Sequence, residues 1–149
     1  MNLYNIPVKP GVDHIGVSVG ALIFNHKGEL FLNERSQLAR NAKGHWEVPG
    51  GMIEFGETRA QAILREIKEE FNIDIIIDSI LHTVDEILVD EKQHWIPTTY
   101  TGKIKKTQVP KIMEPHKCDE IGWFSLGNLP TPLSYITKLD LEEYYKQNV

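Results

Sequence analysis

The chain has 149 residues, 41% of them hydrophobic and 25% charged, which is typical of one globular domain spanning residues 1–149. Its net charge of −5 argues against stable nucleic-acid binding, because that usually requires a basic surface. The single cysteine, Cys118, excludes an internal disulfide, and we expect a buried thiol rather than a nucleophile. No stretch is long enough to span a membrane and residues 1–12 lack the apolar run of a signal peptide, so we expect a cytoplasmic protein.

The first third of the chain predicts short strands. Residues 14–24 are apolar and β-branched, residues 25–28 form a turn, and residues 29–33 alternate apolar and polar side chains, which together predict a hairpin. Residues 46–48 predict a further short strand, and we expect Pro49-Gly50-Gly51 to end it, because proline and glycine interrupt regular structure.

Residues 58–71 predict a helix, because they contain no glycine or proline and are rich in residues with high helix propensity. Thr58 is the expected N-cap, with Gln61 completing a capping box. Asn72 stands where a left-handed C-terminal residue is expected. The apolar side that should pack against a sheet consists of Ala60, Ile63, Leu64, Ile67 and Phe71.

The second half of the chain predicts more strands and a final helix. Residues 73–87 and 95–104 read as a long antiparallel pair, and residues 120–125 as a short strand. Residues 134–146 predict a helix that packs through Ile136, Leu139 and Tyr144. The order of strands, helix, strands and helix predicts an α/β fold with a mixed β-sheet between helices.

An acidic cluster on the first helix is the most informative feature of the sequence. Glu66 lies three and four residues before Glu69 and Glu70, so the three carboxylates share one helix face, which we expect to project away from the packing surface. Such a face is often simply solvated. Three adjacent carboxylates also suit a hard cation such as Mg²⁺ or Mn²⁺, because these ions prefer oxygen ligands.

Residues around the cluster favour the metal interpretation. Gly50 and Gly51 allow a sharp turn and a backbone carbonyl ligand. Glu57 lies at the helix start, where a carboxylate can accept backbone hydrogen bonds. Arg65 can pair with an adjacent carboxylate and hold it in place.

Residues 51–73 resemble the Nudix box, G-x5-E-x7-R-E-U-x-E-E-x-G-U, in which U is a bulky aliphatic residue. Gly51, Glu57, Arg65 and the acidic cluster occupy its defining positions, and Asn72 replaces the last glycine, a mild departure because asparagine tolerates the left-handed conformation. Similar flanking segments extend the resemblance to roughly residues 16–129. It implies an α/β/α sandwich and hydrolysis of a nucleoside diphosphate linked to another group.

The same resemblance implies a residue assignment. Metal would be bound by Glu66, Glu69 and Glu70 together with the carbonyl of Gly50 or Gly51. Arg65 would orient a metal-binding glutamate, and Glu57 would secure the loop and helix geometry. The metal would be Mg²⁺ or Mn²⁺. The six histidines show no metal-ligand spacing, so we expect no dedicated zinc site.

The general base has several candidates. Glu66 is the candidate within the box, and Glu114 resembles the later acid found in some family members, although it could equally be an ordinary exposed loop acid. Glu120 is the second choice outside the box.

The substrate is defined only by class. The sequences around the box and around Glu114 resemble MutT-related diphosphatases, which implies a small nucleotide partner and release of pyrophosphate from nucleoside triphosphates, some of them modified. An ADP-ribose, nucleotide-sugar or dinucleoside polyphosphate pyrophosphatase is a second interpretation. A non-catalytic nucleotide-binding regulator is a third, against which the intact acidic set counts. A homodimer is left open.

Aromatic and basic residues could contact the nucleotide. Tyr4, Phe31, Trp95 and Tyr100 are candidates for stacking on a base, with packing in the core as the commoner role for each. Trp46 is expected to pack beneath the site, and Arg35 to contact a phosphate or pair with an acid.

Overall fold

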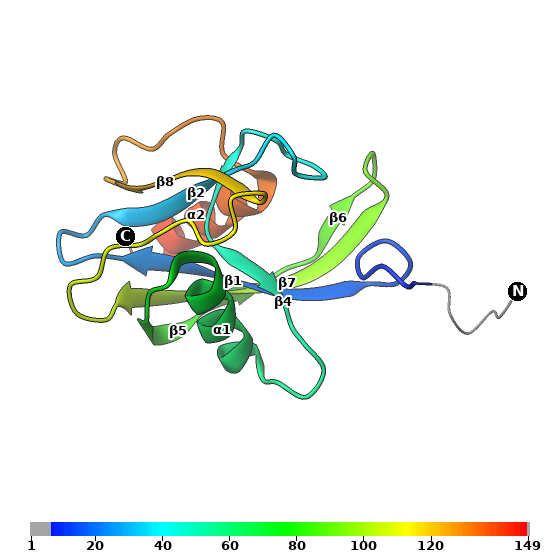
Figure 1. Ribbon diagram of the computed structural model, residues 1–149, viewed down its shortest axis with the longest axis horizontal. Helices are drawn as coiled ribbons and strands as arrows, with labels where there is room; N and C mark the ends of the chain where they lie inside the picture. Colours follow the sequence, from blue (N-terminus) through cyan, green and yellow to red (C-terminus); the bar gives the residue numbers. More distant parts are fainter. Residues whose placement is uncertain (1–6, 149) are drawn as a thin grey trace, which may run out of the picture.

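Residues 7–148 of the computed structural model form eight strands and two helices (Figure 1). In chain order these are β1 (Gly16–Phe24), β2 (Leu30–Arg35), β3 (Trp46–Glu47), β4 (Gly50–Met52), α1 (Arg59–Phe71), β5 (Ile75–Thr83), β6 (Glu86–Leu88), β7 (Gln93–Ile104), β8 (Cys118–Phe124) and α2 (Tyr135–Gln147). Neither helix of these described residues has the length and apolar character that a bilayer crossing requires.

Strand β1 is the centre of a mixed sheet. It runs parallel to β7 along its whole length, from Gly16 opposite Trp95 to Phe24 opposite Lys103. Its other edge is shared by β2 and β4, both antiparallel to it. Beyond these, β5 and β6 pair antiparallel with β7, and β3 and β8 pair antiparallel with β2. The predicted mixed sheet is therefore confirmed.

The two helices cover opposite faces of the sheet, because the side chains of a strand alternate between its faces. On β1, Val19, Ala21 and Ile23 pack in one cluster with α1, whereas Leu22 packs in a second cluster with Leu141 of α2. The α/β/α arrangement expected from the sequence follows from this alternation.

The first helix has the predicted ends. Thr58 Oγ1 accepts a hydrogen bond from Gln61 N at 3.1 Å, and Gln61 Oε1 accepts one from Thr58 N at 2.8 Å. Asn72 has φ 55° and ψ 38°, in the left-handed region. The packing side was predicted less well, because Leu64 is 42% exposed and Ala62 is buried in its place. The buried side is centred on Ile63, and Leu64 lies at its margin.

Two further features differ from the prediction. Strand β3 ends at Glu47, before Pro49-Gly50-Gly51 as expected, but Gly50–Met52 then pairs with β1 as strand β4, which was not predicted. In α2 the buried residues are Thr137, Asp140 and Leu141, while Ile136 and Leu139 are only half-buried. Helix α2 therefore turns a partly polar side toward the sheet, which a prediction from apolar spacing cannot detect.

Candidate functional site

Arg65 lies at the centre of an ion-pair network between α1 and the loop before it. Its Nε and Nη2 donate to the two carboxylate oxygens of Glu57 at 3.0 and 2.6 Å, and Nη2 also donates to the carbonyl of Met52 at 2.9 Å. Its Nη1 donates to Glu66 at 2.9 Å and to Glu69 at 3.3 Å. The Arg65 guanidinium, helped by the backbone N–H of Glu54, holds the pKa of Glu57 below its usual value.

Glu66 lies against strand β4. We expected its side chain to project away from the packing surface of the helix, and it does not. Its side chain is only 12% exposed, and a Cβ on Gly51 would overlap its carboxylate. The physical reason is that α1 packs across β4, where a residue without a side chain leaves room for the carboxyl group. Glu69 is the one member of the cluster that does face solvent, at 53% exposure.

Glu70, the third acid of the cluster, is partly buried. Burial raises its pKa well above the usual range, and a hydrogen bond and charge repulsion from Glu66 raise it further. The positive charge of Lys117 opposes this shift. Glu66 and Glu70 therefore form a crowded pair of carboxyl groups, with Arg65 bound to Glu66 and Lys117 acting on Glu70 as the opposing positive charges.

The segment after β7 brings Glu114 to this pair. Met113 N donates to the carbonyl of Glu70 at 2.9 Å, so the loop is fastened to the end of α1. Glu114, 24% exposed, accepts from Lys117 Nζ at 2.8 Å, and its charge acts on Glu70. Glu120 lies on β8 opposite Glu34 and is exposed. Of the two later acids, the structure brings Glu114 to the box.

The donor set suits a hard cation, because it consists of carboxylates and backbone carbonyls. Within residues 7–148, no three acidic, histidine or cysteine side chains converge on one point closely enough to enclose a cation. Glu66 and Glu70 are adjacent, whereas Glu69 is turned toward Arg65. A divalent cation would offset the mutual repulsion of Glu66 and Glu70.

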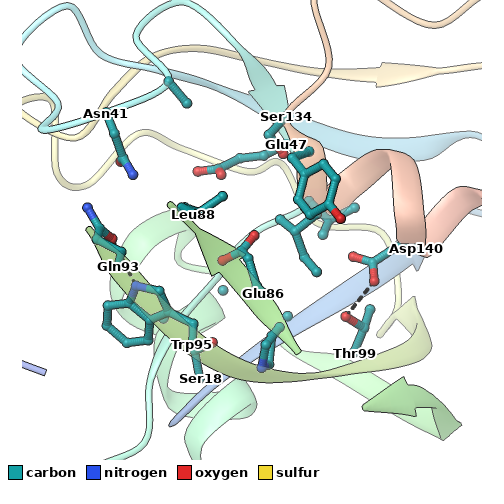
Figure 2. Close-up of a pocket in the computed structure, with 18 of the residues that line it drawn as sticks. Ser18, Asn41, Glu47, Glu86, Leu88, Gln93, Trp95, Thr99, Ser134 and Asp140 are labelled. Carbon is teal, nitrogen blue, oxygen red and sulfur yellow. Dashed lines mark hydrogen bonds between the residues drawn. The ribbon is translucent and has the colours of Figure 1, made fainter. Parts of the chain in front are cut away.

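A cavity of about 310 Å³ lies on the other side of β4 (Figure 2). Its walls come from β1, β3, β6, β7 and the start of α2, and Gly50 and Gly51 form part of its lining. Because Gly51 also lies against Glu66, the cavity and the acidic cluster meet at this residue. The volume is within the range of small-molecule pockets.

Sequence reasoning missed the acids of this cavity. Burial raises the pKa of Glu86 to about 7, with the charges of Glu47 and Asp140 adding to the effect. Burial also raises the pKa of Glu47, against the lowering effect of Arg35, and that of Asp140, against its hydrogen bonds. One signal was present in the sequence: Asp140 stands three residues after Thr137 and next to Leu141, on the packing side of a helix.

The aromatic candidates separate into two groups. Phe31 and Tyr100 are buried in the core, and Trp46 is buried against Phe124, as expected of a packing residue. Only Trp95 lines the cavity among the candidates that the structure describes. Tyr4 lies outside the described residues.

Arg35 and Cys118 have structural partners. Arg35 Nη1 forms an ion pair with Glu47 at 3.1 Å, and its other side-chain nitrogens donate hydrogen bonds to Asn41. Of the two roles expected for Arg35, the structure shows pairing with an acid. Cys118 is buried, and burial raises the pKa of its thiol to about 11, which is the opposite of nucleophile activation.

Curated relatives include two hydrolases of nucleotides or RNA. An RNA pyrophosphohydrolase of Orientia tsutsugamushi strain Boryong is 32% identical over 124 residues, which are 83% of this chain and 62% of that protein. An 8-oxo-dGTP diphosphatase of Proteus vulgaris is 38% identical over 68 residues, 46% of this chain and 59% of that protein. The chain thus spans about three fifths of the length of either relative.

Among solved structures, a MutT NUDIX hydrolase from Burkholderia pseudomallei superposes with a TM-score of 0.80 and is 32% identical, covering 87% of this chain and 98% of that chain. The family model of the NUDIX domain matches residues 14–143, which include every element from β1 to β8 and most of α2. The chain therefore belongs to the NUDIX domain family.

Proposed function

We propose that this chain is a metal-dependent pyrophosphohydrolase that releases pyrophosphate from nucleoside triphosphates. The observation that carries this proposal is the position of Gly51, which lines the cavity on one side and lies against the Glu66 carboxylate on the other. A nucleoside bound in the cavity would extend its phosphates past Gly51 toward the carboxylates of α1.

The residues around α1 would position the metal and the phosphates. Glu66, Glu69 and Glu70 are the proposed ligands, with the carbonyl of Gly50 or Gly51 beside them. The bound Mg²⁺ or Mn²⁺ would offset charge on the leaving phosphate and lower the pKa of a coordinated water. Arg65 acts as a positioning residue, because its guanidinium holds Glu66 and fastens α1 to Glu57 in the preceding loop.

Hydrolysis requires a water oxygen to attack phosphorus while the bridging P–O bond breaks and pyrophosphate leaves with the electron pair. The proton of the water needs an acceptor near Glu70. Glu66 and Glu114 both act on Glu70, and Glu114 also pairs with Lys117 at 2.8 Å. We rank Glu120 below them, because it is exposed on β8.

Two observations favour triphosphates over the other substrates considered. The relative from Proteus vulgaris is named an 8-oxo-dGTP diphosphatase, and the solved structure from Burkholderia pseudomallei is named a MutT hydrolase. The cavity of about 310 Å³ also fits one nucleoside better than the two nucleosides of a dinucleoside polyphosphate.

The test is to incubate the protein with Mg²⁺ or Mn²⁺ and a panel of ribo- and deoxyribonucleoside triphosphates, ADP-ribose, nucleotide sugars and dinucleoside polyphosphates, and to identify the products. We expect a nucleoside monophosphate and pyrophosphate from at least one triphosphate, and none when EDTA replaces the metal. Turnover of no panel member would defeat the enzyme proposal, and turnover of ADP-ribose alone would defeat the substrate class.

Variants then test the assignment of the acids. Glu66→Gln, Glu69→Gln and Glu70→Gln should each weaken Mn²⁺ binding and lower kcat/KM. The loss should be roughly 100-fold for Glu66→Gln and Glu70→Gln, whose side chains are less exposed than that of Glu69. Glu114→Gln should lower kcat while leaving Mn²⁺ affinity unchanged, and Glu120→Gln should do neither. Glu142→Gln, an exposed change on α2, is the matched control. Full activity of Glu70→Gln would rule out the proposed ligand set.

A further inference from the structure

Two cations lie beside the acidic cluster of α1, and they differ in how firmly they are held. Each N–H donor of Arg65 has a partner on the surrounding loop or helix, and its side chain is only 21% exposed. The side chain of Lys117 is 57% exposed, and its Nζ pairs with Glu114 at 2.8 Å. Arg65 is therefore fixed in place, whereas the ammonium group of Lys117 has room to move.

The backbone of Lys117 is fixed, in contrast to its side chain. Its N–H donates to the carbonyl of Glu114 at 2.9 Å, which closes a tight turn between the two residues, and its carbonyl accepts a hydrogen bond from Ser36 N at 3.0 Å, just after β2. Immediately before this turn, Met113 N donates to the carbonyl of Glu70 on α1. The turn is thus fastened at both ends, so a displacement of the ammonium group requires only rotation of the Lys117 side chain.

The ammonium group of Lys117 acts on the same carboxylates that we propose as metal ligands. Its hydrogen bond to Glu114 raises the pKa of Lys117, and the charges of Glu70 and Glu66 raise it further. The positive charge of Lys117 in turn opposes the raised pKa of Glu70. Because an opposite charge favours the ionised form of a carboxyl group, Lys117 provides the cluster with a counter-ion from its own chain.

A divalent cation would compete with Lys117 for this role, because the two positive charges repel each other and need the same negative charge. Once Glu66 and Glu70 coordinate a cation, their attraction for the Lys117 ammonium is largely cancelled. The ammonium group then lies on an exposed, flexible stem beside the place where negative charge develops on the leaving phosphates. Lysine is well suited to bind phosphate in such a position, because its ammonium is a compact point charge with rotatable donors.

We propose that Lys117 exchanges partners at the active site: it neutralises the acidic cluster before metal binds, and afterwards it contacts the leaving pyrophosphate. Arg65 is not available for this second role, because its donors are already used. The inference rests on the proposed function, because it takes Glu66 and Glu70 as metal ligands and pyrophosphate as the leaving group.

Two binding measurements on Lys117→Met test the exchange, and their expected results have opposite signs. Electron paramagnetic resonance measures Mn²⁺ binding without nucleotide, and the variant should bind Mn²⁺ roughly fivefold more tightly, because a competing positive charge is removed. Isothermal titration calorimetry measures pyrophosphate binding at saturating Mn²⁺, and the variant should bind pyrophosphate roughly fivefold more weakly, because a phosphate contact is lost. Lys117→Arg keeps the charge and should resemble the unaltered protein in both measurements.

Lys27→Met, an exposed change in the turn between β1 and β2, is the matched control and should alter neither affinity. A purely structural role of Lys117 would weaken both ligands together in Lys117→Met, and that result would overturn the proposal. An unchanged affinity for either ligand would also overturn it. Thermal denaturation checks that the variants fold, and Lys117→Gln takes the place of Lys117→Met if that variant does not.

The same measurements separate this inference from the proposed function. Equal Mn²⁺ and pyrophosphate affinities in Lys117→Met and the unaltered protein, together with triphosphate hydrolysis, would defeat only the inference. The two opposite shifts without hydrolysis of any triphosphate would defeat only the enzyme proposal. Failure of the unaltered protein to bind Mn²⁺ would defeat the metal site and the role of Lys117 with it.

Discussion

Gly50 and Gly51 are adjacent in the sequence, but the structure requires glycine at the two positions for different reasons. A Cβ on Gly50 would overlap the carbonyl oxygen of Val19, which belongs to the backbone of β1 and cannot move without breaking the β1–β4 pairing. A Cβ on Gly51 would overlap the Glu66 carboxylate, which is the end of a flexible side chain. The first glycine is needed for the sheet, and the second for the position of an acid.

This difference predicts that Gly51→Ala changes activity much more than stability. Glu66 would rotate away from the added methyl group, and a displacement of about 1 Å in a positioned group can lower the rate about 100-fold. The melting temperature should change little, because only a side chain has to move. Metal-dependent hydrolysis and thermal denaturation measure the two effects.

Gly127→Ala is the matched control, since a Cβ there would meet no atom within 4 Å. Gly50→Ala should behave in the opposite sense to Gly51→Ala, with a clear loss of stability. Undiminished hydrolysis by the Gly51→Ala variant would mean that the position of Glu66 against β4 is not required.

At the scale of elements, α1 was predictable because its signals are local. Thr58, Gln61 and Asn72 lie within one stretch of chain and act on its own backbone. The same logic fails where partners are distant in sequence. The parallel pairing of β1 with β7 and the hydrogen bond from Met113 to Glu70 join segments that no short pattern connects. Strand β4 was missed because its partner, β1, lies about thirty residues earlier.

The left-handed Asn72 at the end of α1 gives an element-scale prediction. Asn72→Gly should be close to neutral in stability and activity, because glycine adopts φ 55° without strain. Asn72→Ala should cost about 1 kcal/mol of unfolding free energy, because a Cβ is disfavoured in this conformation. Urea denaturation of the two variants measures the difference. Equal stability of the glycine and alanine variants would show that the backbone there is unstrained or rearranges.

At the scale of the whole molecule, β4 separates two acidic regions. Glu66 and Glu70 lie toward α1, with Glu114 brought in from the segment after β7, and Glu47, Glu86 and Asp140 line the cavity beyond. The sequence located the first region through the spacing of its acids. It did not locate the second, because its residues come from β3, β6 and α2, and only the folded sheet brings them together.

The second region makes the stability of the fold depend on pH. The carboxyl of Glu86 faces Glu47 of β3, Asp140 of α2, Glu91 of the turn before β7, and one cation, Arg35 of β2. Burial and these charges raise its pKa from 4.5 to about 7 in the folded protein. Because this pKa is raised, folding favours the neutral form of Glu86. The contribution of Glu86 to the free energy of unfolding is therefore fully present below about pH 4.5, and it is lost as the pH rises through 7.

Glu86→Gln keeps the shape of the side chain and removes its ionisation. At pH 8 the variant should therefore be more stable than the unaltered protein by roughly 1–2 kcal/mol, after allowance for solvent screening, and at pH 5 the difference should shrink to a few tenths. Urea denaturation at both pH values measures it, with the exposed Glu142→Gln as control. A stabilisation that is equal at the two pH values would show that packing, and not the charge of Glu86, is responsible.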